Sequence, residues 1–569
     1  MEDHIMQNPM LYLIYSVMRK RGKKALKKFE DACETADTYT EELLMRLIND
    51  AKDSEYGKKY HFDQIHSIED YKRLVPISQY DDYEPYIMKM YKENVDDQLT
   101  GRHCVQFALT SGSTGLPKLI PVVQDVIDLY SDMGCSRTFA LGSRYLKEHN
   151  KKFPYYKCLN LIEVTDYSSD KGKKMGAISE TALERIKPFF KYVSTSPDEI
   201  IFPKEKIDLK YLKLLFALRE ENICFIASAF TTVVADLFVY LSEHWESLVE
   251  DIKNGTISKN IEMSAELRKT LTGKLRPDPK RANELKKEFE KGFDTPILPR
   301  IWPRCSWIGA IGTGTFEPYT EIMRRYVGND IAHDNLLYAA SESIFAACPE
   351  MNSSEFAMIP QSGFYEFVPA EDDDLSHTLN MNELEIGKEY ELIVTNLSGF
   401  YRYRMYDVVK VLGFKGKSPL IRFVYRKNQV VNLVGEKTNA AALAAAVEAF
   451  GKEIGCNIVE YSVYPDVSND SARYCFVIEP EHELDVSKCD EYAKIMERKL
   501  GECNMPFQYA VETGELKKST LVIVQSQTYQ LWRELQIAKG ILPNQIKPVR
   551  LIDTPEKEKF FMGLKERNM

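Results

Sequence analysis

Several features are missing from this sequence, and each absence excludes a class of protein. The eleven cysteines include no Cys-x-x-Cys pair and the nine histidines form no His-Glu-x-x-His motif, so neither a zinc site nor a protein-held catalytic metal is indicated. The odd number and irregular spacing of the cysteines exclude a disulfide framework and fit a reducing cytoplasm. The net charge is −10, so no nucleic acid is expected as a partner.

Long apolar runs are also absent. Residues 10–18 form the best candidate, but a spanning helix needs about 20 apolar residues. A basic cluster at residues 19–24 follows this run, whereas a secretory signal carries its positive charge before it. We therefore expect no membrane span. The segment is interpreted as a packed N-terminal helix with a solvated end; contact of the basic cluster with a membrane surface stays an alternative.

What is present is a globular chain of 569 residues, of which 44% are hydrophobic. Helical periodicity dominates residues 1 to about 100, and residues 124–145 are predicted as one helix. Short apolar runs alternate with helical ones between about 155 and 250, which predicts an α/β core. Residues 260–292 are predicted as a solvated helical insertion, residues 364–413 as strands, and the rest as a compact α+β unit.

The densest motif is Thr-Ser-Gly-Ser-Thr-Gly-Leu-Pro-Lys-Leu-Ile-Pro at residues 110–121, between two apolar runs. It predicts a loop held by two strands. Glycine lets the backbone approach a ligand closely, hydroxyl and N–H groups donate to phosphate oxygens, and Lys118 adds a mobile positive charge. The loop therefore indicates nucleotide-phosphate binding, with an ordinary Ser/Gly turn as the alternative. The spacing is not that of a Walker A loop, so a different nucleotide fold is required.

Three later motifs carry weaker signals. Small residues at 309–315 allow close approach of a flat ring such as adenine. Glu342 lies in a turn of small residues and could bind Mg²⁺, or could be an exposed turn residue. Asp407 follows an Arg/Tyr cluster and suits a ribose, or could form a structural pair with an arginine.

In this order, the loop at 110–118, the Tyr-x-x-Ser-Glu turn at 338–342 and the Tyr-Arg-Tyr-Arg-x-x-Asp-Val-Val segment at 401–409 resemble the adenylate-forming superfamily, which includes acyl-CoA synthetases and luciferases. Further segments resemble the Gretchen Hagen acyl acid–amido synthetases, known from auxin and jasmonate conjugation in plants. These segments are residues 75–77, 80–87, 196–199, 401–414, 426–428 and 547–550. The resemblance covers nearly the whole chain.

The resemblance implies an α/β fold in which a large N-terminal adenylate-forming domain with β-sheets and flanking helices, residues 1–425, precedes a smaller mobile α+β domain, residues 426–569. It also implies a two-step ligase. A carboxylate attacks the α-phosphate of ATP to give an acyl-adenylate and pyrophosphate, and an amine, usually of an amino acid, then displaces AMP to form an amide. Transfer to the thiol of coenzyme A, or nucleotide binding without catalysis, stay alternatives.

Individual roles follow from the same resemblance. It assigns nucleotide binding to Thr110, Ser111, Gly112, Ser113, Thr114, Gly115, Tyr338, Ser341, Asp407 and Arg426. Lys118 and Lys547 are the candidate catalytic residues, with Lys547 on the mobile domain. Glu342 is the candidate ligand of Mg²⁺. Arg137 stands where related enzymes contact the carboxylate of the acyl acid, although an arginine there is otherwise a surface residue.

The implied partners are ATP, a small carboxylic acid and an amino acid or other amine, handled by a cytoplasmic monomer. Two departures from the family pattern stand out. Tyr406 occupies a position where related enzymes more often have glycine, and the loop at 113–117 is nearer the general superfamily form than the plant form. They indicate a divergent, non-plant member whose acid is not a hormone.

Overall fold

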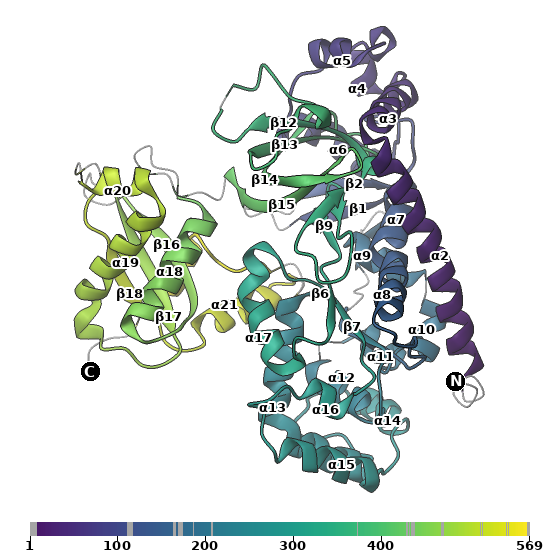
Figure 1. Cartoon of the computed structure of the whole chain (residues 1–569), viewed down its shortest axis with the longest axis vertical. Coiled ribbons are helices and arrows are strands. Elements are labelled where there is room, and N and C mark those ends of the chain that lie inside the picture. The colour runs from purple at the N-terminus through teal and green to yellow at the C-terminus, as the bar shows by residue number, and fades with distance from the viewer. Residues whose placement is uncertain are drawn as a thin grey trace. The chain divides into compact units, whose positions relative to one another are not determined.

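The computed structural model describes residues 8–110, 118–162, 167–168, 174–185, 187–205, 207, 209–372, 374–427, 431, 433, 438–467, 472–512, 514, 516–541, 543 and 546–565. The chain divides into two compact units, which are described separately (Figure 1). The first comprises residues 1–405 and 410–423, the second residues 406–409 and 424–569. The domain division after residue 425 stays a prediction.

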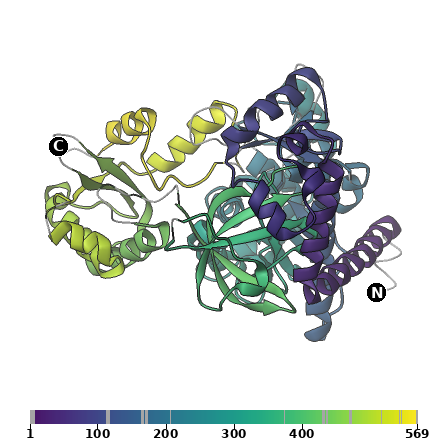
Figure 2. The same cartoon turned by 90° about the horizontal axis from the view of Figure 1, so that it is seen from above.

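The first unit begins with helices, as predicted. They are α2 (Pro9–Glu34), α3 (Ala36–Ala51), α4 (Glu55–Lys59), α5 (Ile68–Leu74) and α6 (Tyr80–Glu93). The side chain of Asn8 caps α2 by accepting from the Leu11 N–H at 3.1 Å, and Pro9 supplies the fixed φ that suits a first helical position. Figures 1 and 2 show α2 as a long helix along the edge of this unit.

A parallel sheet forms the α/β core of the first unit. Its order is β3 (Leu159–Asn160), β6 (Phe225–Phe230), β7 (Trp307–Ile311) and β8 (Ala332–Asp334). Alternate residues pack on opposite faces: Ile226 and Ile308 join one hydrophobic core, whereas Phe225 and Trp307 stack at 4.8 Å in another. Burial on both faces is what a parallel sheet requires, and it confirms the predicted core.

Helices cover both faces of this sheet. They are α8 (Arg137–Glu148), α9 (Ile178–Glu184), α10 (Lys187–Val193), α11 (Asp198–Ile201), α12 (Leu209–Leu218), α13 (Thr231–Asn254), α14 (Ala265–Thr272), α15 (Pro279–Phe289), α16 (Leu298–Ile301) and α17 (Glu317–Val327). The predicted solvated insertion at 260–292 contains α14 and α15, but Leu271, Leu285 and Phe289 are buried in the core. Only the outer face of this segment is therefore solvated.

Two further sheets complete the first unit. One has the order β2-β1-β5-β4, with β1 (Cys104–Thr110) and β2 (Lys118–Val123) antiparallel, β4 (Tyr167–Ser168) and β5 (Lys174–Met175). The other has the order β12-β13-β14-β15-β11-β10-β9, and its strand β14 runs partly in the second unit. Its strands are β9 (Leu337–Ala339), β10 (Ile344–Ala347), β11 (Phe356–Met358), β12 (Gly363–Pro369), β13 (Glu389–Asn396), β14 (Tyr403–Lys415) and β15 (Ser418–Arg426).

The single helix predicted at 124–145 is interrupted. It consists of α7 (Gln124–Tyr130), a π-helical turn η2 (Ser131–Ser136) and α8, which ends at Glu148. A π turn carries an extra residue and so rotates every side chain that follows it. The face on which Arg137 lies could therefore not be read from a regular 3.6-residue period.

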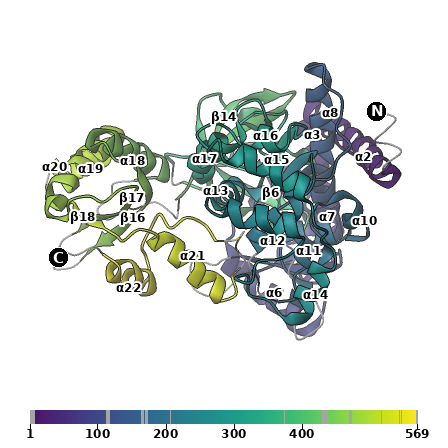
Figure 3. The ribbon, with the colours of Figure 1, turned by 90° about the horizontal axis from the view of Figure 1, so that it is seen from below.

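The second unit is a three-stranded sheet with helices on both faces (Figure 3). Its elements are α18 (Ala440–Ile454), β16 (Ile458–Asp466), β17 (Arg473–Pro480), α19 (Cys489–Cys503), α20 (Met505–Glu512), β18 (Thr520–Ile523), α21 (Thr528–Ala538) and α22 (Pro555–Gly563). Phe476 and Ile478 of β17 pack in the core with α18 and α19, whereas Cys475 and Val477 pack with α21 and α22. The predicted α+β unit is confirmed.

In the described part of the chain, no helix is both long enough and apolar enough to cross a bilayer.

Candidate active site

The predicted phosphate loop joins the paired ends of β1 and β2. Thr110 lies opposite Lys118 in the antiparallel register, so the two strands flank the loop as predicted. Residues 111–117, which include Ser111, Gly112, Ser113, Thr114 and Gly115, lie outside the described residues, as does the side chain of Thr110. Their phosphate-binding role stays a prediction.

Lys118 is held at the mouth of this loop by Tyr80 of α6. Its ammonium nitrogen lies 4.7 Å from the centre of the Tyr80 ring, a distance at which a cation is attracted to the ring face. The Tyr80 hydroxyl lies 3.0 Å from the backbone nitrogen of Leu119 and 3.2 Å from its carbonyl oxygen. Tyr80 thus fixes the start of β2 and the direction of Lys118. The sequence motif around residue 80 gave no sign of this contact.

Glu342 lies in the turn between β9 and β10. The Tyr403 hydroxyl donates to Glu342 Oε1 at 3.3 Å, and the amide nitrogen of Asn396 donates to the Glu342 carbonyl oxygen at 2.7 Å. The Ala340 N–H closes the turn on the Ser343 carbonyl at 2.9 Å. Tyr403 of β14 thus contacts the carboxylate itself, whereas Asn396 of β13 holds the backbone of the same residue. Tyr403 and Asn396 are positioning residues that sequence reasoning missed, because they lie over 50 residues from Glu342.

The surroundings of Glu342 fit a divalent ion that arrives with a phosphate. Among the described residues, no three His, Cys, Asp or Glu side chains gather into a metal-binding group. Mg²⁺ is commonly bound by one or two carboxylates together with substrate phosphates and water. A single positioned carboxylate is therefore sufficient for such an ion, and the role of Glu342 remains a prediction.

Tyr338 and Ser341, the other predicted residues of this turn, are half-buried. The Tyr338 ring belongs to an aromatic cluster: it lies 5.4 Å from Phe345 and 6.0 Å from Phe423, between ring centres. A side chain at Gly314 would contact Phe423 at 3.3 Å, and two residues later Phe316 stacks on Phe230 at 4.4 Å. The cluster thus lines the end of β7 with partly exposed rings.

Among the small residues after β7, Gly312 has a structural role that the sequence did not indicate. A Cβ at Gly312 would lie 2.3 Å from Thr320 Oγ1 and 2.7 Å from Thr231 Cγ2, so glycine is required here by packing inside the protein. The Gly312 N–H donates to Asn335 Oδ1 at 3.1 Å. Gly314, with φ +64°, takes the left-handed conformation that glycine allows at low cost. Close approach to an adenine ring does not explain Gly312.

Asp407 is buried on β14 and accepts from Arg426 Nε of the neighbouring β15 at 2.7 Å. Both residues belong to the second unit. The alternative of a structural Arg–Asp pair is therefore realised. It does not exclude ribose binding, because a carboxylate has about four acceptor positions and can accept from more than one donor. Tyr406, just before it, has φ +61°. This is the conformation for which glycine is favoured.

Arg137 is not available for a substrate, which corrects the prediction made for it. Its side chain is fully buried and forms an ion pair with Asp334 at 3.1 Å. It also donates to the backbone carbonyls of Met133, Cys348 and Leu336 at 2.9, 2.5 and 2.9 Å. The guanidinium therefore ties the π turn to β8 and the residues after it. A contact with the acid's carboxylate would require breaking this network.

Lys547 belongs to the second unit and is exposed. The residues just after it are fixed on β16: Ser462 Oγ donates to the Val549 carbonyl at 2.6 Å, and Arg550 pairs with Glu460 at 2.6 Å and lies 4.1 Å from the centre of the Tyr461 ring. The backbone that carries Lys547 is thus anchored two residues downstream. Its catalytic role stays a prediction.

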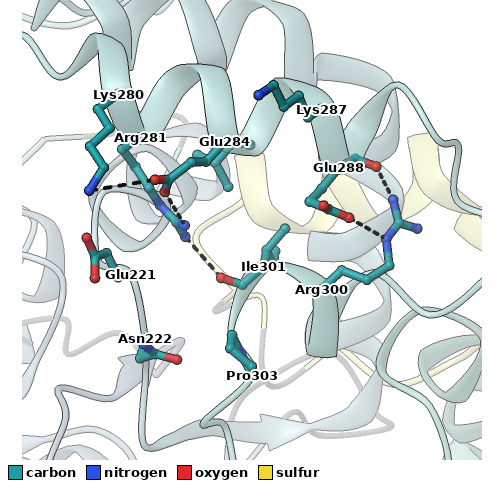
Figure 4. A pocket seen from close by; sticks show the side chains of 11 residues that line it. Glu221, Asn222, Lys280, Arg281, Glu284, Lys287, Glu288, Arg300, Ile301 and Pro303 are labelled. Carbon is teal, nitrogen blue, oxygen red and sulfur yellow. Dashed lines mark hydrogen bonds and ion pairs between the residues drawn. The ribbon is translucent and has the colours of Figure 1, made fainter.

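A separate cavity of about 440 Å³ lies between α15 and α16 (Figure 4). Its two arginines are occupied within the protein: Arg300 pairs with Glu288 at 3.2 Å, and Arg281 donates to the backbone carbonyls of Leu218 and Ile301. None of the predicted site residues lines it. We therefore do not assign the reaction to this cavity.

Comparisons with known proteins identify the family of this chain. The GH3 family N-terminal domain matches residues 25–331, the GH3 family central domain residues 356–426, and the GH3 family C-terminal domain residues 441–556. A jasmonoyl–L-amino acid synthetase of Nicotiana attenuata, JAR6, is 27% identical over 477 residues, covering 79% of this chain and 80% of that protein. The probable indole-3-acetic acid-amido synthetase GH3.1 of Arabidopsis thaliana is 26% identical and covers 94% of this chain and 92% of its own length.

Among solved structures, the GH3.15 acyl acid amido synthetase superposes with a TM-score of 0.81 at 22% identity and covers 95% of this chain and 96% of its own. This likeness shows that the fold is shared, including a large N-terminal part and a smaller C-terminal part. The predicted resemblance and fold class are confirmed. The chain belongs to the GH3 family.

Proposed function

We propose that this protein is an ATP-dependent ligase that joins a carboxylic acid to the amine of an amino acid. In the first step an oxygen of the acid's carboxylate bonds to the α-phosphorus of ATP, and pyrophosphate leaves. In the second the amine nitrogen bonds to the acyl carbon, AMP leaves with the electron pair of the broken C–O bond, and the amine loses a proton. The observation that carries the proposal is the match to three successive GH3 domains in a chain that aligns along most of its length with amido synthetases.

The residues take the following roles in this proposal. The loop at 111–115 and Lys118 hold the phosphates, with Lys118 aimed by Tyr80. Glu342, positioned by Tyr403 and Asn396, holds a Mg²⁺ ion, which would neutralise phosphate charge when bound. Tyr338 and Ser341 contact the nucleotide beside this turn. Asp407 accepts from the ribose hydroxyls while Arg426 keeps its carboxylate in place.

Lys547 supplies positive charge during adenylation, from a C-terminal domain that is mobile. Catalysis then depends on positioning and on charge neutralisation, as in other phosphoryl chemistry. Because Tyr338 shares its cluster with other partly exposed rings, we expect the acid to carry an apolar or aromatic body. A monomeric state and a cytoplasmic location also stay predictions.

The test is a panel of aromatic and aliphatic carboxylic acids, with pyrophosphate release as the readout and hydroxylamine as the trapping amine. Active acids are then combined with each amino acid or with coenzyme A, and the products are identified by mass spectrometry. An amide product is expected. A thioester formed in preference to an amide would replace the proposal with an acid–CoA ligase, and ATP binding without turnover across the panel would indicate a nucleotide-binding protein.

Lys547→Ala tests the catalytic assignment. The variant should slow acid-dependent pyrophosphate exchange while its thermal unfolding stays unchanged, because Lys547 is exposed. Lys559→Ala, at another exposed lysine of the second unit, is the matched control. Exchange at the normal rate in the Lys547 variant would remove this residue from the site.

A further inference from the structure

Helix α2 has a charge pattern unlike that of the rest of the chain. Between Pro9 and Phe29 the sequence contains seven lysine and arginine residues and no aspartate or glutamate, although the whole protein carries a net charge of −10. Such a local excess of positive charge creates a strong positive electrostatic potential at that part of the surface. Two of the seven serve packing, since Arg19 donates to Ser143 and Tyr155 and Arg21 pairs with Asp132. The five lysines do not, because their side chains are exposed.

The two faces of α2 differ clearly. Leu11, Tyr15, Leu26 and Phe29 are at most 3% exposed and join a hydrophobic core of the first unit. On the other face the first two turns expose aliphatic side chains, with Leu13 at 54% and Val17 at 56%. The next turns expose lysines on the same side: Lys20, Lys23, Lys24, Lys27 and Lys28. Figures 1 and 3 show the helix at the edge of its unit. We call these seven residues the α2 outer face.

Most of these lysines have no acidic partner. In the described residues, Lys27 pairs with Asp31 at 3.0 Å, whereas Lys20, Lys23, Lys24 and Lys28 form no ion pair. The lysine-rich helix α15 differs, because glutamates alternate with its lysines: Lys280 and Lys286 each lie opposite a glutamate one turn on, at 3.9 and 3.7 Å. Alternating charges of this kind belong to an ordinary solvated helix face. The α2 outer face thus carries four lysines whose charge no ion pair compensates, and one lysine whose charge is compensated.

We propose that the α2 outer face docks this protein on the surface of an anionic lipid bilayer. Lysines at the headgroup plane attract negative lipids, and aliphatic side chains beside them enter the interfacial layer. A nucleic-acid backbone would use the lysines but offers no apolar phase for Leu13 and Val17. The helix of 26 residues extends about 39 Å, so its exposed side can lie along a flat surface. The contact is peripheral, since Leu11, Tyr15, Leu26 and Phe29 stay in the protein core.

The experiment is sedimentation of the full chain with large vesicles, either of phosphatidylcholine alone or with 30 mole per cent phosphatidylserine. Binding is expected only to the anionic vesicles, and it should weaken as salt is raised, because added ions screen charges at a surface. Lys20→Gln with Lys24→Gln should lower the affinity at least about tenfold, since each basic residue near an anionic surface contributes substantially to binding. Leu13→Ser with Val17→Ser should lower it as well.

The matched control is Lys280→Gln with Lys287→Gln, which removes the same charge from an exposed helix of the same unit. It should bind like the unchanged protein. All four α2 substitutions are at exposed or partly exposed side chains, so thermal unfolding should be unaffected. The proposal is overturned if the protein binds both vesicle types equally or binds neither. It is also overturned if the α15 control loses as much affinity for the anionic vesicles as the α2 lysine variant, or if the protein binds duplex DNA more tightly than the anionic vesicles.

Discussion

Removal of the Asp407 carboxylate tests whether the buried ion pair with Arg426 also serves the nucleotide. In Asp407→Ala the ribose would lose a charged acceptor, and a hydrogen bond to a charged group contributes about 2 kcal/mol, which corresponds to roughly 30-fold weaker ATP binding. The fold should survive. The Arg426 side chain is 25% exposed, so water can solvate the guanidinium when its partner is removed.

Calorimetric titration of two nucleotides separates the two roles. The unchanged protein should bind ATP roughly 30-fold more tightly than 2′,3′-dideoxy-ATP, because only ATP offers the hydroxyls. In Asp407→Ala the two nucleotides should bind equally. Asp466→Ala, which removes another Asp–Arg pair of the second unit, is the control and should keep the preference for ATP. If Asp407→Ala weakens the binding of both nucleotides by the same factor, Asp407 acts only through Arg426 and the ribose assignment is wrong.

Three further predictions concern single side chains. Tyr403→Phe keeps the ring but removes the hydroxyl that donates to Glu342. Calorimetry should show that the variant binds ATP a few-fold more weakly when Mg²⁺ is present and equally well when Mg²⁺ is absent. An equal loss of affinity with and without Mg²⁺ would refute the positioning role. The Tyr406→Gly variant should be about 1 kcal/mol more stable than Tyr406→Ala in denaturant unfolding. Both variants lack the ring, and only glycine adopts φ +61° at low cost. Equal stability of the two variants would contradict the conformational explanation. Burial lowers the pKa of His333 from 6.5 to about 4, so its contribution to stability is complete above pH 6.5 and is lost as the pH falls toward 4. That contribution is about 3 kcal/mol, and in His333→Gln the acid-dependent loss of unfolding free energy should be smaller by this amount.

The local elements of the fold could be predicted because each depends on a local pattern. The hairpin of β1 and β2 follows from two apolar runs that flank a Gly/Ser segment, and α2 follows from its apolar spacing. Strand β15 was missed: it directly follows β14 in the chain, but its other partner, β11, lies far earlier in the sequence, so no local pattern marks its place inside the sheet. The π turn before Arg137 was missed for another reason. A regular helix and an interrupted one can share the same apolar pattern over so few residues.

Among the site residues too, those in a local motif could be predicted and those that depend on distant contacts could not. Lys118, Glu342 and Asp407 could be proposed because each stands in a short motif with chemical meaning. The residues that support them could not, because the folded chain alone brings them to the site: Tyr403 and Asn396 lie on neighbouring strands, and Tyr80 lies on a helix that packs against β2. The error at Arg137 has this origin too: its partner Asp334 lies 197 residues further along the chain, and no local pattern distinguishes an arginine in a buried pair from one that awaits a ligand.

The tyrosine before Asp407 shows what a departure from a family pattern means physically. Related enzymes more often have glycine at this position, and Tyr406 therefore placed the path of the backbone in doubt. The structure shows the path in this chain: Tyr406 adopts φ +61°, a conformation that glycine adopts at low cost, and Asp407 directly after it accepts from Arg426. A non-glycine residue in this conformation costs about 1 kcal/mol, which the surrounding strand pairing must offset. A tyrosine at this position therefore raises the conformational energy of the strand, while the Asp407 carboxylate pairs with Arg426.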